Sequence, residues 1–236
     1  MITFKNISFS YKDDIVLDDF NDFFEEDKIN CIVAPSGAGK TTLLNLLAGL
    51  ITPSSGVILN KPTNISYVFQ ETRLIPEKTV FKNLDFILKT VILDKNERYL
   101  KIIEYLKIVE LEEKIDKYPL HLSGGEKQRL SLIRSFVYPS SILLLDEAFK
   151  NLDIQIKRSI FSYFLKLWNI EKRTVIFVTH EIDEALLVGD NIHIYSREPL
   201  KLMKLIEIDP SFVRTKLYDS NIEEIRKQVL LEIEKW

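Results

Sequence analysis

Residues 29–49 read INCIVAPSGAGKTTLLNLLAG, and this stretch predicts three consecutive structural elements. Ile29 to Val33 form a short, β-branched run that is typical of a buried strand. Small residues and glycines follow, and then a helical pattern that ends at Gly49, as helices often do. A strand, a glycine-rich loop and a helix in this order are a recognisable α/β unit.

The middle of this stretch matches the phosphate-binding loop, except that Ala34 replaces the usual first glycine. Small residues let backbone N–H groups approach phosphate oxygens, and the start of the next helix adds a positive dipole. Lys40 would supply a full charge to the β- and γ-phosphates, and Thr41 can bind Mg²⁺. Ala34 either keeps a backbone conformation open to alanine, which we favour, or strains the loop by about 1 kcal/mol. The predicted nucleotide-binding residues are Ala34, Pro35, Ser36, Gly37, Ala38, Gly39, Lys40, Thr41 and Thr42.

Residues 141–147, SILLLDE, read as a buried strand that ends in two carboxylates. The carboxyl ends of parallel strands meet at one edge of a sheet, so both side chains are expected beside the phosphate-binding loop. Asp146 would hold Mg²⁺ and its water, and Glu147 would polarise the attacking water, a role typically worth about 10² to 10⁴ in rate. The alternative is a strand-end pair that only caps the next turn.

Further elements follow from apolar spacing. Residues 2–11 alternate like a strand, with a one-residue shift near Asn6, and a turn at Asp13-Asp14 precedes a second strand. Residues 79–122 show helical spacing, residues 154–169 read as a helix, and residues 174–179 read as another buried strand. This alternation predicts an α/β fold with a largely parallel sheet that is covered on both faces.

The tail has a helical apolar face. This helix either docks on its own domain, which we favour, or binds a partner. The residues on that face are Ile222, Ile225, Val229, Ile233 and Trp236.

Composition limits the functional classes. The formal charge of −3 shows no basic excess that would indicate nucleic acid as a partner. The single cysteine, Cys31, lies in an apolar run and is expected to be a buried thiol, which suits a reducing compartment. The apolar runs are far shorter than the roughly 20 residues of a membrane span, and residues 1–5 lack the apolar segment of a signal peptide. We therefore expect a cytoplasmic protein that meets a membrane only through a partner.

Residues 122–129 read LSGGEKQR. In physical terms Ser123 and two glycines would open a helix and create a second anion-binding helix start. A flexible Ser-Gly-Gly turn would explain the glycines but not the octet, which resembles the signature motif of the ATP-binding cassette (ABC) family. That resemblance implies contact with the γ-phosphate held by a partner subunit, through Ser123, Gly124, Gly125 and Glu126.

Other positions match the family in the expected order. Gln70 resembles the glutamine that touches Mg²⁺ or the attacking water, and His180 resembles the histidine that contacts the γ-phosphate. Tyr11 stands where the family stacks an aromatic ring on adenine. Without the resemblance, His180 would read as an incidental histidine and Tyr11 as a plain strand residue. Residues 151–153 resemble the loop that crosses the dimer interface, although Lys150 before them is less usual.

The resemblance runs from about residue 2 to residue 200, and it implies a RecA-like P-loop core with an antiparallel β subdomain. An inserted α-helical subdomain (about 76–138) and a C-terminal extension (about 201–236) complete a single domain of residues 1–236. It further implies a homodimer or cassette dimer that binds ATP and Mg²⁺ head to tail. Thr41, Gln70 and Asp146 would surround the metal.

The implied partners are an integral membrane permease and, indirectly, an extracytoplasmic solute-binding protein. Residues 69–76, 145–149 and 178–185 look like the importer branch that serves nitrate, sulfonates or taurine. That branch usually has Pro where Ala148 stands and Trp where Glu77 stands. The tail is too short for the regulatory barrel of sugar or polyamine importers.

Two alternatives come from other functional classes. Chromosome and repair ATPases of the family insert long coiled coils, but Lys40 and Ser123 are only 83 positions apart, and ribosomal types usually carry two cassettes. A binding-only regulatory subunit would lack catalytic groups, whereas Asp146, Glu147 and His180 are all present. We therefore expect an ATPase coupled to transport, with no nucleic acid as partner.

Overall fold

The computed structural model describes residues 1–150, 152–197, 199–209 and 220–234, so the predicted contributions of Asn151 and Trp236 lie outside the described residues. Short 3₁₀ helices lie at Glu112–Lys114 and Pro119–His121. The strands are β1 (Ile2–Tyr11), β2 (Asp14–Phe24), β3 (Ile29–Val33), β4 (Ser55–Leu59), β5 (Ile65–Val68), β6 (Ile142–Asp146), β7 (Thr174–Thr179), β8 (Asn191–Tyr195) and β9 (Leu202–Glu207). The helices are α1 (Lys40–Ala48), α2 (Val80–Leu88), α3 (Lys95–Ile108), α4 (Gly124–Val137), α5 (Ile154–Ile170), α6 (Ile182–Val188) and α7 (Ser220–Ile233).

The central sheet has the strand order β5-β6-β7-β3-β8-β9. Neighbouring strands run parallel from β5 to β8, and β9 joins the edge antiparallel to β8. The predicted α/β fold with a largely parallel sheet is confirmed. The three strands predicted for this sheet, β3, β6 and β7, are its central ones, where both faces are buried and the apolar signal is strongest.

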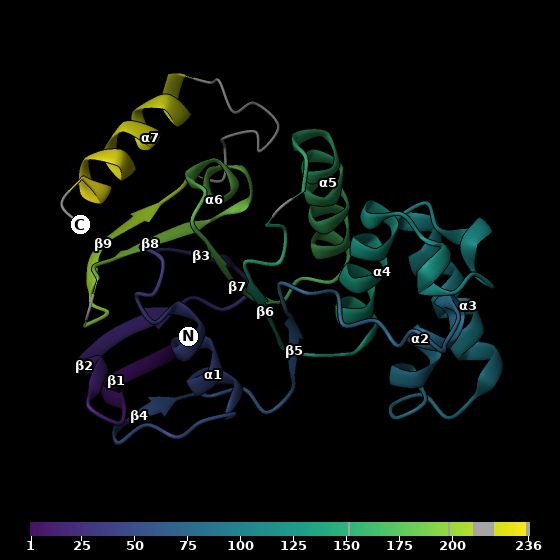
Figure 1. Ribbon diagram of the computed structural model, residues 1–236, viewed down its shortest axis with the longest axis horizontal. Helices are drawn as coiled ribbons and strands as arrows, with labels where there is room; N and C mark the ends of the chain where they lie inside the picture. Colours follow the sequence, from purple (N-terminus) through teal and green to yellow (C-terminus); the bar gives the residue numbers. More distant parts are fainter. Residues whose placement is uncertain (151, 198, 210–219, 235–236) are drawn as a thin grey trace.

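The two faces of this sheet are covered differently. On β3, Cys31 and Val33 belong to an apolar cluster with α2 to α7, whereas Ile32 belongs to a second cluster with α1, β1 and β2. One face is thus covered by helices and the other by α1 and the antiparallel sheet, which confirms the expectation of two covered faces (Figure 1). Cys31 is a fully buried thiol, as predicted.

The antiparallel sheet has the order β2-β1-β4. The predicted shift near Asn6 is confirmed, because Asn6 has φ 51° and the β1–β2 register changes between Phe4 and Ile7. The predicted turn at Asp13-Asp14 is wrong by one residue. Tyr11 pairs with Asp14, and the turn is made by Lys12, which adopts a left-handed conformation (φ 53°), together with the residue after it.

A buried polar group joins the two sheets. Asp22 on β2 accepts a hydrogen bond from the hydroxyl of Tyr195 on β8, and its Oδ2 lies 2.9 Å from Nδ1 of His193. Burial, followed by the Asp22 carboxylate, raises the pKa of Tyr195 well above its ordinary value, so its hydroxyl remains a donor. Leaving a buried polar group without its hydrogen-bond partner typically costs about 1–3 kcal/mol, so these contacts help to fix the antiparallel sheet on the core.

The helices between β5 and β6 form a group of their own. Figure 1 shows α2, α3 and α4 gathered beyond the β5 edge of the central sheet, and α7 near the opposite edge, next to β8, β9 and α6. Ile222 and Val229 of α7 are buried in the main core, which confirms that the tail helix docks on its own chain. Among the described residues, no helix is long and apolar enough to cross a membrane.

Candidate nucleotide-binding site

The phosphate-binding loop connects β3 to the start of α1. Gly37 and Gly39 adopt positive φ angles of 80° and 99°, which turn the chain sharply into the helix. No side chain caps the start of α1. Its first backbone N–H groups therefore have no intrahelical or side-chain acceptor, which is the arrangement that binds phosphate.

Ala34 fits the loop without strain. Its backbone φ is negative, and its side chain is fully buried in the cluster beneath α1. The interpretation we favoured from the sequence, that this position is open to alanine, is confirmed.

Lys40 lies folded into the loop. Its side chain is 5% exposed, and its Nζ donates to the carbonyl oxygens of Ala34 (2.9 Å) and Pro35 (2.8 Å). Burial lowers the pKa of Lys40, although Glu147 and Asp146 oppose this effect. The loop carbonyls accept hydrogen bonds from this ammonium but carry no full negative charge. A bound phosphate would supply that charge.

Asp146 ends β6 beside the loop. Its Oδ1 accepts from Thr41 Oγ1 (3.3 Å) and its Oδ2 from the hydroxyl of Tyr67 (3.1 Å). Burial raises the pKa of Asp146, and these two hydrogen bonds oppose the increase. The described residues contain no cluster of three or more metal-ligating side chains. A hydroxyl and a carboxylate side by side nevertheless fit Mg²⁺, which commonly takes one or two protein oxygens and completes its shell with phosphate and water.

Glu147 lies beside two lysines and a histidine. Its Oε1 is 3.8 Å from Nδ1 of His180 and 4.0 Å from Nζ of Lys40, and its Oε2 is 2.6 Å from Nζ of Lys150. Burial acts to raise the pKa of Glu147, but Lys150, then Lys40 and His180, outweigh it and hold the pKa below its usual value. The residue has φ 46°, and its N–H donates to the carbonyl of Val178, so the strand end aims the carboxylate at the loop. The structure thus brings together Lys40, Glu147 and His180 from three separate elements.

The signature segment caps α4 with its own side chains. The N–H of Glu126 donates to Ser123 Oγ (3.3 Å), and the N–H of Ser123 donates to the Glu126 carboxylate (2.7 Å). The Ser123 N–H is the main reason that the pKa of Glu126 is lowered. Ser123 and Gly124 are exposed, and a methyl group added at Gly124 would meet no described atom within 4 Å. This helix start faces open space rather than its own phosphate-binding loop.

Two predicted site residues do not touch the others. Tyr11 is 48% exposed, and its ring packs edge-on against Phe9 with centroids 4.8 Å apart. Gln70 lies just after β5, is exposed, and its side chain makes no hydrogen bond within the described residues.

The model of the family described as ABC transporter matches residues 17–150 of this chain. The chain belongs to the ABC transporter family. An uncharacterised ABC transporter ATP-binding protein of Methanocaldococcus jannaschii is 36% identical over 91% of this chain and 82% of its own length. The aliphatic sulfonates import ATP-binding protein SsuB of Bacillus cereus is also 36% identical, over 93% of this chain and 89% of its own.

Solved structures agree with this assignment. The dimeric structure of the bacterial ABC transporter cassette MJ0796 superposes with a TM-score of 0.76 at 28% identity, covering 89% of this chain and 99% of that one. A structure of the same cassette in a post-hydrolysis state, bound to ADP and Pi, gives a TM-score of 0.74 at 27% identity. The predicted ABC cassette fold is confirmed, and the chain is an ATP-binding subunit that hydrolyses ATP to ADP and phosphate.

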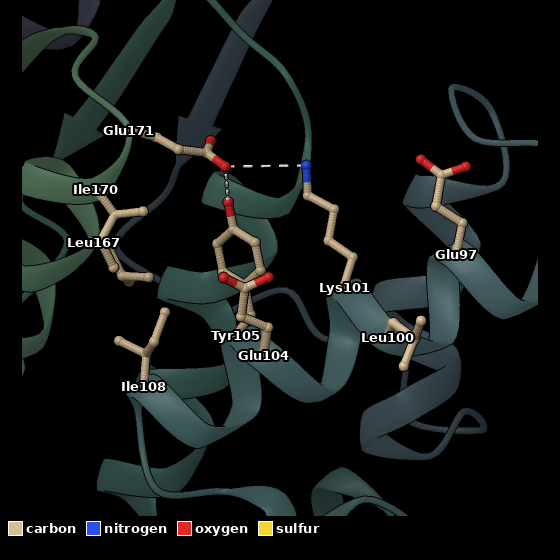
Figure 2. A pocket seen from close by; sticks show the side chains of 9 residues that line it. All are labelled: Glu97, Leu100, Lys101, Glu104, Tyr105, Ile108, Leu167, Ile170 and Glu171. Atoms are coloured by element: carbon tan, nitrogen blue, oxygen red, sulfur yellow. Dashed lines mark hydrogen bonds and ion pairs between the residues drawn. The ribbon is translucent and has the colours of Figure 1, made fainter.

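A hollow away from the site of this ABC ATPase lies between α3 and α5, with a volume of about 350 Å³. Figure 2 shows Glu171 meeting the hydroxyl of Tyr105 and the ammonium of Lys101 there, and Glu171 also pairs with Arg173. The carboxylate of Glu171, at the end of α5, is therefore already paired with polar groups that α3 presents to this hollow. No predicted site residue lines it; the lining residues are Glu97, Leu100, Lys101, Glu104, Tyr105, Ile108, Leu167, Ile170 and Glu171.

Sequence reasoning missed two groups that touch the site of the ABC ATPase. Tyr67 binds Asp146, and Lys150 binds Glu147. The position of Lys150 was visible as unusual in the sequence, but its ion pair was not. Tyr67 gave no signal, because its contact exists only once β5 lies beside β6.

Gly39 provides a test of the loop geometry. A methyl group added there would lie 2.4 Å from Cγ1 of Val16, in a conformation that L-residues rarely adopt. Strain of about 1–2 kcal/mol alone corresponds to roughly a tenfold loss. We therefore expect Gly39→Ala to weaken binding of a fluorescent ATP analogue at least about tenfold, and Val16→Ala to restore only part of the loss. Ala34→Gly is the control and should change affinity less than about threefold; unchanged binding by Gly39→Ala would contradict this geometry.

Proposed function

We propose that two copies of this chain, or this chain and a second cassette, bind two ATP molecules head to tail. Each triphosphate lies between the Lys40 loop of one subunit and the Ser123 segment of the other. The observation that carries the proposal is the exposed start of α4, where Ser123 and Gly124 are open to solvent and a methyl group added at Gly124 would meet no described atom within 4 Å. A helix start of this kind can bind an anion. The dimeric cassette structure to which this chain is similar supports it.

Within each site, the residues divide the work. The loop residues 34–42 cradle the phosphates, with Lys40 on the β- and γ-phosphates, and Tyr11 stacks on adenine. Glu147 orients the attacking water and accepts its proton as general base. The lowered pKa of Glu147 keeps this carboxylate ionised at neutral pH. His180 reaches the γ-phosphate from the end of β7. From the partner, the N–H groups of the segment Ser123, Gly124, Gly125 and Glu126 face the same phosphate.

Mg²⁺ is the second cofactor in this proposal. Thr41 and Asp146 would hold it, with Gln70 reaching it or the attacking water once nucleotide is bound. The ion supplies positive charge that offsets the charge developing on the transferred phosphoryl group. The pairing of Thr41 with Asp146 supports this assignment, since it places two hard oxygen ligands next to the phosphate loop.

Hydrolysis would open the dimer. The γ-phosphate is the group that both subunits grip, so its departure removes the attraction across the interface. The closed state is then favoured by ATP and the open state by ADP, which is a population shift driven by differential binding.

The movement would drive an integral membrane permease. We propose that the segment from Gln70 into the helical subdomain (about 76–138) meets the permease, and that a solute-binding protein delivers solute on the outer side. The cassette would then lie in the cytoplasm, on the inner face of the membrane. The resemblance to import ATP-binding proteins supports this placement.

For the solute, we propose a small molecule such as an aliphatic sulfonate, taurine or nitrate. Several of the most similar relatives bear the name aliphatic sulfonates import ATP-binding protein. Ala148, which stands where the importer branch usually has proline, is fully buried, and its carbonyl accepts a hydrogen bond from the Gln128 amide. Proline could accept the same bond, so the replacement leaves this contact possible.

Glu147→Gln tests the catalytic assignment. The amide cannot accept the proton of the attacking water, so hydrolysis should slow by at least about 10²-fold while ATP still binds. We expect light scattering to show a dimer with ATP and a monomer with ADP. Glu113→Gln, on an exposed 3₁₀ turn, is the control and should keep the wild-type rate. A Glu147→Gln protein that stays monomeric at saturating ATP would count against the head-to-tail dimer.

Growth tests the solute. Deletion of the gene should abolish growth of the source organism on an alkanesulfonate as sole sulfur source and leave growth on sulfate intact. The wild-type gene should restore growth, and the Lys40→Ala gene should not, because the ammonium that neutralises the phosphates is lost. Unimpaired growth of the deletion strain on the sulfonate would refute this solute.

A further inference from the structure

Tyr67 lies at the edge strand of the central sheet and reaches the carboxylate at the end of the next strand. Its hydroxyl donates to Oδ2 of Asp146 at 3.1 Å, while Oδ1 of the same carboxylate accepts from Thr41. Each oxygen of Asp146 therefore has one donor, and the two donors come from β5 and α1. Two hydrogen bonds from opposite sides fix the plane of a carboxylate, whereas one leaves it free to rotate.

The ring of Tyr67 is itself held by a stack. Phe69 lies parallel to it, with centroids 4.2 Å apart and an interplanar angle of 14°. The guanidinium carbon of Arg73 lies 3.7 Å from the centroid of the Phe69 ring. The offset between the two rings and the cation over the ring face are both attractive arrangements. Consecutive contacts thus connect Asp146, through the rings of Tyr67 and Phe69, to Arg73 in the segment after β5.

The far end of the stack is tied to α4, the helix that begins at the signature segment. Arg134 of α4 donates to the carbonyl of Arg73 (2.6 Å) and to the carbonyl of Thr72 (2.9 Å), and Ser131 also donates to Thr72 (3.3 Å). Arg73 has a left-handed backbone (φ 43°), which turns its side chain back over Phe69. A displacement of α4 would therefore pull directly on the residues that hold the ring of Tyr67.

We propose that Tyr67 is a positioning residue that holds the Asp146 carboxylate for the Mg²⁺–nucleotide complex, and that the Phe69–Arg73 stack makes this hold depend on the position of α4. This inference rests on the proposed role of Asp146. Groups that orient metal ligands through hydrogen bonds typically contribute about 10- to 100-fold in metal affinity.

Tyr67→Phe removes only the hydroxyl and keeps the ring in the stack. We would measure binding of a fluorescent β,γ-imido ATP analogue, which is not hydrolysed, by the full chain during titration with Mg²⁺. The Mg²⁺ concentration for half-maximal binding should rise about tenfold. Binding of the same analogue in EDTA should not change, because the phosphate loop and adenine contacts are intact. Tyr99→Phe, a half-exposed tyrosine of α3, is the matched control and should leave both values unchanged.

Arg73→Gln and Phe69→Leu test the stack. Each should raise the Mg²⁺ requirement about threefold or more in the wild-type background. In the Tyr67→Phe background each should add little, because the hydroxyl that the stack positions is already absent. Additive effects of the two changes would overturn the coupling part of the proposal.

Asp146→Asn distinguishes a failure of the positioning role of Tyr67 from a failure of the proposed metal-binding role of Asp146. If Asp146→Asn keeps the wild-type Mg²⁺ requirement, Asp146 does not serve the metal and the proposed function of this residue fails. If Asp146→Asn loses the Mg²⁺ dependence while Tyr67→Phe titrates like the wild type, only the positioning role is refuted. An equal loss of binding by Tyr67→Phe with and without Mg²⁺ would also refute it, since that result indicates general damage to the site.

Discussion

The uncapped start of α1 is the constraint on which the rest of the site depends. Its backbone N–H groups have neither a helical acceptor nor a side-chain cap, and two glycines with positive φ aim them at one point. The second helix start, at α4, is capped by Ser123 and Glu126 and faces open space. In the proposed dimer, the start of α1 binds the nucleotide held by its own chain. The start of α4 instead contacts the nucleotide held by the partner chain.

Charge around this helix start is balanced before any nucleotide arrives. Lys40, Lys150 and His180 surround Glu147, and Lys40 is held by loop carbonyls. A triphosphate brings several negative charges into this group, so the cations must be shared between the phosphates and the carboxylates. In the proposed mechanism, redistribution of these contacts would give ATP and ADP different effects on the same loop, and thereby on whether two subunits stay together.

The sequence predicted the parts of this structure whose signal is local. The phosphate-binding loop, the buried strands β3, β6 and β7, the helix start at Ser123 and the tail helix could all be inferred from spacing and composition. The strand β4 could not, because most of its residues are exposed and it carries no apolar pattern. The contacts of Asp22 with His193 and Tyr195, and of Tyr67 with Asp146, join residues far apart in the chain and depend on strand order. The solute could not be inferred in this way, because the predicted site residues were all assigned to the nucleotide and its metal ion.

The central claim, that each nucleotide is gripped by two chains, is tested most directly by mixing two inactive variants. Lys40→Ala damages the phosphate loop, and Ser123→Arg blocks the start of α4. In a mixed dimer both lesions fall in one site and the other site is intact. About half of randomly formed dimers are mixed, and each of these has one working site of two. Mixing should therefore restore ATP hydrolysis to at most about one quarter of the wild-type rate. If both elements served the same nucleotide within one chain, the mixture would stay as inactive as its components, and the account would be contradicted.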